Sequence, residues 1–137
     1  MIIVEFLNKT RKKIDKKVFQ KYVRNGEKVL RERIQKLCGK RKRLILSLTL
    51  VDNQEIAKLN EEWRGKKGST DVLSFSNIEK VSVFPFDGHI GDIIISLEKV
   101  ESQASDKNHT FQQELAIMFV HGFLHIFGYD HQTDSEE

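Results

Sequence analysis

The sequence predicts an α+β fold in which helices pack on a small four-stranded β-sheet. Four short apolar stretches have the alternation or composition of strands, and stretches with helical periodicity separate them. The chain has 137 residues, which is the length of one ordinary domain. Hydrophobic residues make up 39% of it and charged residues 31%, as is typical of a globular protein. We therefore expect one domain, residues 1–137, that buries a core without disulfides.

The N-terminal third is expected to form a strand and then a helix. Residues 1–8 (MIIVEFLN) have strand composition and end at a polar loop. From Asp15 onward, apolar residues recur every three or four positions, which indicates a helix with one buried stripe. Asn25-Gly26 is a candidate kink in this helix, and Gly39 is a candidate stop. The stripe consists of Phe19, Tyr22, Val23, Gly26, Leu30, Ile34 and Leu37.

The middle of the chain shows the clearest strand. In RLILSLTLVD, residues 43–52, leucines alternate with Ile, Ser, Thr and Val, so the leucines are expected to share one face. Asp52 is expected to cap the next helix, with Glu55 as its capping-box partner. Ile56, Leu59 and Trp63 form the predicted buried stripe of that helix, which should end near Arg64.

Two further strands and two helices complete the prediction. The strands are DVLSFSN (71–77) and GDIIISLEK (91–99), and residues 78–89 between them are expected to form a loop containing Pro85. A short helix is predicted for LEKVESQAS (97–105). Thr110 and Gln113 have capping-box spacing, so a last long helix should start there and run to Phe127.

Cysteine content and hydropathy indicate a cytoplasmic protein. Cys38 is the only cysteine, so no intramolecular disulfide can form. The opening MIIVEFL lacks the basic region and the long apolar region of a secretory signal. No stretch approaches the roughly 18 apolar residues that cross a membrane, so no membrane association is expected.

The charge is divided unevenly along the chain. Residues 1–50 carry 16 Lys and Arg against 4 Asp and Glu, whereas residues 51–137 carry 7 against 16. The basic part is a candidate surface for a polyanion such as nucleic acid. The alternative interpretation is a solvated basic helix face.

Three histidines near the C-terminus have the spacing of a metal site. His121 and His125 are four residues apart on a predicted helix, so they share one face. Gly128 is suited to ending that helix, and His131 follows after the chain has turned. The pattern H-x-x-x-H-x-x-G-x-x-H resembles the metzincin arrangement. Three ligands leave one coordination position open, as in catalytic zinc sites; nickel, copper and iron are chemical alternatives.

The residue after the first histidine differs from that of zinc peptidases. In H-E-x-x-H the glutamate is the general base, whereas Gly122 stands here and cannot accept a proton. Charge developing at a metal-bound substrate would then need another stabilising group, for which Arg64 in WRGKK is the candidate. The alternative for Arg64 is a solvated turn. Asp130 is either a carboxylate that orients an imidazole or a turn residue.

Four stretches together resemble one protein family: HGFLHIFGYDH (121–131), STDVLSFS (69–76), GDIIIS (91–96) and NEEWRGKKGSTDV (60–72). On these residues the sequence resembles the bacterial YbeY family, the zinc-dependent endoribonucleases linked to ribosomal RNA maturation. Ser76 stands where the family pattern has a proline. The likeness extends over roughly residues 44–131, and residues 1–43 match only in their order of strand and helix.

The resemblance implies a mixed four-stranded sheet and one zinc ion held by His121, His125 and His131. It implies Arg64 and His121 as catalytic residues. It also implies a substrate of single-stranded RNA, with a role in maturation of the 16S ribosomal RNA 3′ end and contact with the small ribosomal subunit.

Two other functions fit the same residues. One is a metallopeptidase-like hydrolase of peptides or small esters, against which Gly122 argues. The other is a non-enzymatic ribosome assembly factor with a structural zinc. That function requires a fourth ligand, for which His109 and Asp134 are candidates.

Overall fold

A computed structural model of the chain describes residues 1–38, 43–68, 70–78 and 88–129. These residues form a four-stranded sheet in the order β1-β2-β4-β3. The strands are β1 (Ile2–Asn8), β2 (Leu44–Val51), β3 (Val72–Ser76) and β4 (Gly88–Ser96). The helices are α1 (Lys17–Val29), α2 (Arg31–Cys38), α3 (Asn53–Arg64), α4 (Leu97–Lys107) and α5 (Phe111–Ile126).

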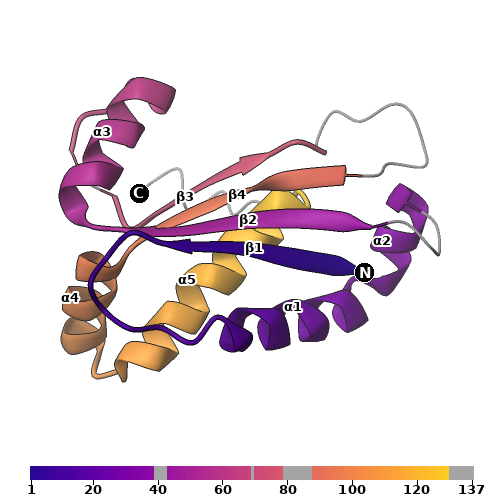
Figure 1. Cartoon of the computed structure of the whole chain (residues 1–137), viewed down its shortest axis with the longest axis horizontal. Coiled ribbons are helices and arrows are strands. Elements are labelled where there is room, and N and C mark those ends of the chain that lie inside the picture. The colour runs from indigo at the N-terminus through magenta and orange to yellow at the C-terminus, as the bar shows by residue number, and fades with distance from the viewer. Residues whose placement is uncertain (39–42, 69, 79–87, 130–137) are drawn as a thin grey trace.

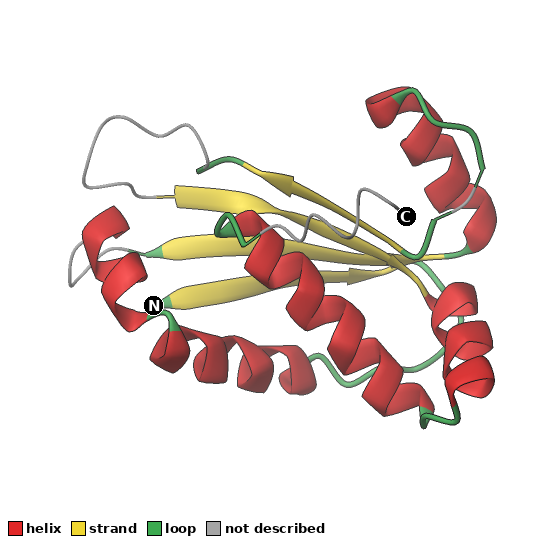
Figure 2. Cartoon of the chain, turned by 180° about the vertical axis from the view of Figure 1, so that it is seen from behind, coloured by secondary structure: helices red, strands yellow, loops and turns green. Residues whose placement is uncertain are grey.

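The sheet is mixed, as predicted. β1 pairs with β2 and β2 with β4 in parallel, and β3 runs antiparallel to β4 at the edge of the described sheet. α1 and α5 cover one face, while α3 lies at the opposite face near one end (Figures 1 and 2). The α+β prediction is therefore confirmed.

The main core lies between the sheet and the pair α1 and α5. The alternating leucines of β2 are all fully buried there, as the sequence predicts: Leu44, Leu46, Leu48 and Leu50. Burying a leucine side chain stabilises a fold by roughly 1.5–3 kcal/mol, so this one strand is a large contributor. A smaller cluster of Val51, Ile56 and Leu73 packs α3 on the other face.

The predicted kink at Asn25-Gly26 is wrong. The helix continues through Gly26, and the break between α1 and α2 falls at Leu30. Gly26 instead admits the ring of Phe123 from α5, because a Cβ there would lie 2.6 Å from Phe123 Cε2. The predicted stop at Gly39 lies outside the described residues.

Both ends of α3 lie where the sequence predicts them, but two of its side chains make other contacts than expected. Asp52 caps the helix by accepting the Glu55 backbone N–H at 2.8 Å, but the Glu55 carboxylate pairs with Lys9 at 2.7 Å. Trp63 is 69% exposed, although it was expected to be buried. Its ring stands 6.2 Å from that of Phe75, and α3 covers only one end of this face, so nothing described closes over the indole.

Strand β4 begins earlier than expected. It starts at Gly88, three residues before the predicted start, so His89 belongs to a strand rather than to a loop. The His89 side chain lies against β2, where Nε2 is 3.0 Å from Ser47 Oγ. Pro85 lies outside the described residues. Among the described helices, none combines the length and the apolar character that a membrane span needs.

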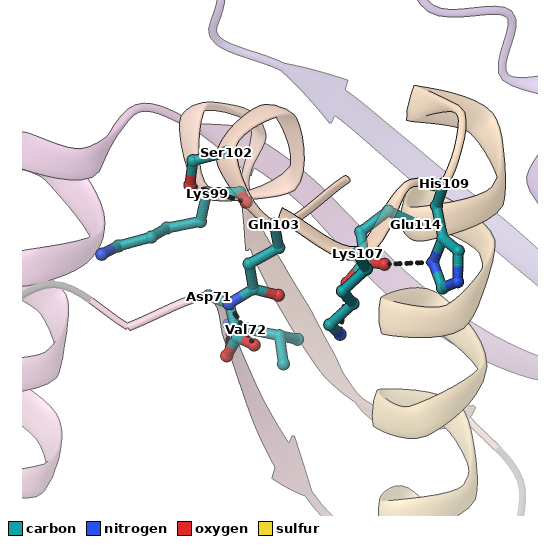
Figure 3. Close-up of polar contacts among 8 residues, drawn as sticks. All are labelled: Asp71, Val72, Lys99, Ser102, Gln103, Lys107, His109 and Glu114. Atoms are coloured by element: carbon teal, nitrogen blue, oxygen red, sulfur yellow. Dashed lines mark hydrogen bonds and ion pairs between the residues drawn. The ribbon is translucent and has the colours of Figure 1, made fainter. Parts of the chain in front are cut away.

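The start of α5 is fixed by a polar cluster (Figure 3). Thr110 and Gln113 form the predicted capping box. Glu114 in the first turn is only 1% exposed, and its carboxylate accepts hydrogen bonds from His109 Nδ1 at 2.9 Å and Lys107 Nζ at 3.0 Å. These contacts fix α5, which carries the histidines, to the end of α4.

A second contact in the same region fixes β3. Asp71 accepts the Val72 backbone N–H at 2.8 Å, and its other carboxylate oxygen accepts from Gln103 of α4 at 3.3 Å (Figure 3). The start of β3 is therefore held against α4.

Replacing Glu114 with glutamine is expected to lower the free energy of unfolding by about 2 kcal/mol at pH 7, because two charge-assisted hydrogen bonds lose their ionised acceptor. Burial alone would raise the pKa of Glu114, but the hydrogen bonds and charges of His109 and Lys107 hold it below its usual 4.5. A carboxylate with a lowered pKa stabilises the fold above its unfolded-state pKa, and this stabilisation disappears as the pH falls through the folded-state pKa.

Thermal unfolding between pH 7 and pH 3 should therefore depend less steeply on acid in Glu114→Gln than in the unchanged protein. Glu62→Gln is the matched control, since Glu62 is exposed on α3. Equal acid dependence in Glu114→Gln and the unchanged protein would show that the ionised Glu114 carboxylate does not stabilise the fold.

Candidate metal centre

Helix α5 presents two of the three predicted ligands on one face. His121 and His125 are four residues apart, about one turn and roughly 6 Å along the axis. His121 is exposed and His125 is half-buried. The helix passes over the sheet with its C-terminal half next to β3 and β4 (Figure 2). The predicted helical pair is therefore present, on a rigid element.

His125 is held from behind by the edge strand. Ser74 of β3 places Oγ 2.8 Å from His125 Nδ1. If Nδ1 carries the proton and donates it to Ser74, the lone pair lies on Nε2, which is the form of the ring that binds a metal. The sequence reasoning gave Ser74 no role. The one feature of the sequence that could have pointed to Ser74 is its hydroxyl between the apolar residues Leu73 and Phe75. Ser74 occupies a strand position that faces the helices.

The end of α5 turns the chain back after His125. Gly128 has φ of 89°, and its N–H donates to the His125 carbonyl at 3.0 Å. The Tyr129 N–H donates to the Leu124 carbonyl at 2.9 Å, so the pair forms a Schellman ending. The predicted role of Gly128 is confirmed. Asp130 and His131, the third predicted ligand, lie outside the described residues.

Gly122 has a packing role that the sequence did not reveal. It is buried, and a Cβ at this position would lie 3.2 Å from Cγ2 of Ile93 on β4. The position after the first histidine thus faces the sheet, where even a Cβ would be in tight contact with Ile93. A glutamate at this position would point into the interface between α5 and β4.

Arg64 is the last residue of α3 and is exposed. Gly65 ends the helix with φ of 68°, and Asn60 Nδ2 donates to the Gly68 carbonyl at 3.0 Å, which holds the following loop. Among the described contacts, none joins Arg64 to either histidine of α5.

Trp63, the residue before Arg64, and His125 approach the edge strand from opposite faces. Trp63, next to Arg64, stands by Phe75, whereas His125 bonds to the neighbouring Ser74. Successive side chains of a strand point to opposite faces, so β3 separates the two groups.

A structural zinc site would need a fourth ligand, and neither candidate for it is found beside His121 and His125 among the described residues. His109 lies at the other end of α5, about 15 Å or more from His121 by the rise of a helix. It is bonded to Glu114. Asp134 lies outside the described residues.

The described donor set fits a zinc ion in part. Two imidazoles on one helix face, one of them hydrogen-bonded through Nδ1, are the ligand type that zinc accepts. Within the described ranges, no three His, Cys, Asp or Glu side chains cluster closely enough to hold a metal. A complete site therefore needs a ligand from beyond these ranges, and His131 is the one that the sequence predicts.

Comparison with known proteins identifies one family. The family model described as "Endoribonuclease YbeY" matches residues 5–137. Endoribonuclease YbeY of Bacillus licheniformis is 46% identical over 98 residues, covering 67% of this chain and 62% of that protein. Endoribonuclease YbeY of Fusobacterium nucleatum is 47% identical over 96 residues, covering 69% and 59%. The matches thus span about three fifths of the length of these curated relatives.

A solved structure supports the fold. The solution structure of TM1509 from Thermotoga maritima is similar with a TM-score of 0.53 and 30% sequence identity. The match covers 98% of this chain and 79% of that one.

Ser74→Ala is expected to weaken zinc binding about 10- to 100-fold, because the imidazole of His125 loses the group that orients it. Zinc affinity measured by competition with a chelating dye checks this. Ser76→Ala is the matched control: Ser76 Oγ donates to the Ile126 carbonyl at 2.7 Å, so it also joins β3 to α5 without touching an imidazole. Equal zinc affinities in the two variants would show that Ser74 has no part in the metal centre.

Proposed function

Because the chain belongs to the YbeY family of endoribonucleases, we propose that it is a zinc-dependent endoribonuclease that cuts single-stranded RNA. One observation carries the proposal: α5 offers an imidazole pair whose inner member is oriented by Ser74. Family membership supplies the reaction class, and this geometry supplies a reason for metal dependence.

In this proposal His121, His125 and His131 hold one zinc ion. When bound, zinc would act as a Lewis acid toward an oxygen of the RNA phosphodiester. Ser74 fixes the orientation of the His125 ring through Nδ1, so that Nε2 would be the nitrogen that binds the metal. Because the first ligand, His121, is exposed and therefore accessible to a substrate, we assign it to the catalytic as well as the metal-binding residues.

Arg64 is the proposed cation for the phosphate. A guanidinium matches two phosphate oxygens at once and stays charged at any working pH. Trp63, the residue before Arg64, lies on the face of β3 opposite to His125. In this proposal an RNA strand that meets both Arg64 and the metal passes the end or edge of β3. An extended, flexible substrate suits such a path, which favours single-stranded RNA over a duplex.

The buried position of Gly122 speaks against a peptidase. The usual base position faces Ile93 in the interface between α5 and β4, so no side chain there can reach a bound peptide. Phosphodiester cleavage aided by a metal and an arginine does not require a base at that position.

We further propose a place for this activity. The chain would act as one metal-dependent hydrolase domain, residues 1–137, in the cytoplasm. Its substrate would be ribosomal RNA, at the 16S 3′ end, on or near the small ribosomal subunit. The basic N-terminal part supports an RNA partner, since it supplies positive charge to a polyanion.

Cleavage of a labelled single-stranded RNA tests the proposal. His121→Ala should abolish cleavage and bound zinc together. Arg64→Ala should lower the cleavage rate by about 100-fold with zinc content unchanged, the loss typical of removing one group that stabilises transition-state charge. Zinc is measured by elemental analysis of the same samples.

Lys58→Ala is the control for Arg64→Ala, since Lys58 is an exposed cation on the same helix. Casein serves as the peptidase substrate. Casein cleavage would favour the hydrolase alternative. RNA cleavage at the rate of the unchanged protein in both His121→Ala and Arg64→Ala would trace the activity to a contaminating nuclease and overturn the proposal.

A further inference from the structure

We infer that a basic groove at the junction of α1 and α2 binds the sugar-phosphate backbone of the same single-stranded RNA, some nucleotides away from the bond that is cut. This inference rests on the proposed function and adds a second contact surface to it. Three observations support the inference: the shape of the groove, its positive charge, and its position beside the turn that ends α5 after His125.

The groove forms where α1 stops and α2 begins. The break at Leu30 changes the direction of the chain and leaves a hollow of about 670 Å³ between these helices and the end of α5. That volume is in the range of small-molecule sites, roughly 300–1,000 Å³. Its polar and aromatic lining consists of Lys28, Arg31, Glu32, Arg33, Lys36 and Tyr129.

The lining is strongly basic. Four cations face one carboxylate, Glu32, and within the described part of the chain none of the four forms an ion pair. A solvated helix face would spread such charges over a convex surface. Here they converge on one hollow, where like charges repel one another, and an anionic ligand relieves that repulsion.

The groove reaches the turn that follows the second histidine. The guanidinium of Arg33 lies over the ring of Tyr129, 4.8 Å from its centroid. Arg33 Nη2 also lies 2.9 Å from the point that a Cβ on Gly128 would occupy. Tyr129 comes four residues after His125 and is 40% exposed. The groove thus includes Tyr129, a residue of the turn that follows the helical pair of histidines.

Cations combined with an exposed aromatic ring are what proteins use to bind single strands. Lys and Arg follow the phosphates, and a ring such as that of Tyr129 offers a surface on which a base stacks. A strand held both here and at the metal is bound at two linked sites, so each contact raises the effective concentration of the other. A short RNA that occupies the metal centre alone gains nothing from the groove.

The experiment compares Arg31→Gln/Lys36→Gln with Lys17→Gln/Lys21→Gln. Both double variants lose two exposed positive charges from the basic part of the chain, and only the first pair lines the groove. Affinity for a 20-nucleotide RNA is measured by fluorescence anisotropy in a His121→Ala background, which prevents cleavage. Cleavage of the 20-nucleotide RNA and of a 4-nucleotide RNA is measured with His121 intact.

The groove variant should bind the long RNA about tenfold more weakly at 0.15 M salt, and the slope of log affinity against log salt should fall by about 1.4, from roughly 0.7 per phosphate contact. It should cut the 4-nucleotide RNA at the rate of the unchanged protein. The control pair should lose clearly less affinity and less slope than the groove variant, and it should cut both RNAs at the rate of the unchanged protein.

Unchanged long-RNA affinity in the groove variant, or an equal loss in the control pair, would overturn the inference. A failure of the proposed function would give a different result. The unchanged protein would then cut neither RNA, whatever the groove contributes to binding.

Discussion

The close approach of α5 to the sheet at Gly122 is the constraint on which the candidate site depends. Without a side chain at 122, the helix lies against Ile93 of β4. At that separation two serines of β3 reach α5: Ser74 meets the His125 ring and Ser76 meets the Ile126 carbonyl. A larger side chain at 122 would press on Ile93 and move the helix outward, which lengthens the contact between Ser74 and His125. The glycine that stands in place of a peptidase base therefore also favours the close packing in which the imidazole is held.

Local features of the site were predictable and long-range ones were not. The spacing of His121 and His125 and the helix end at Gly128 are set by residues within one or two turns, so sequence periodicity was enough. Ser74 lies 51 residues from His125, and only the pairing of β3 with β4 brings it there. Trp63 was misjudged because helical periodicity says which face is apolar and not whether anything covers it.

The basic N-terminal part of the chain, residues 1–50, also combines a feature that the sequence predicts with one that it does not. Composition predicted a polyanion surface or a solvated face, and nothing in the sequence chose between them. The break at Leu30, which replaced the expected kink four residues earlier, gathers Lys28, Arg31 and Lys36 around one hollow. Arg33 then joins that hollow to Tyr129 and the end of α5. The RNA surface that we propose near the histidines would thus be a consequence of tertiary packing rather than of charge alone.

The central claim is that the helical histidine pair, completed by His131, forms a three-imidazole zinc site. X-ray absorption at the zinc edge tests it most directly. We expect three imidazole nitrogens at about 2.0–2.1 Å in the unchanged protein and two in His131→Ala, with no sulfur ligand in either. The same number of imidazoles in both proteins, or a sulfur ligand in the unchanged one, would contradict the claim.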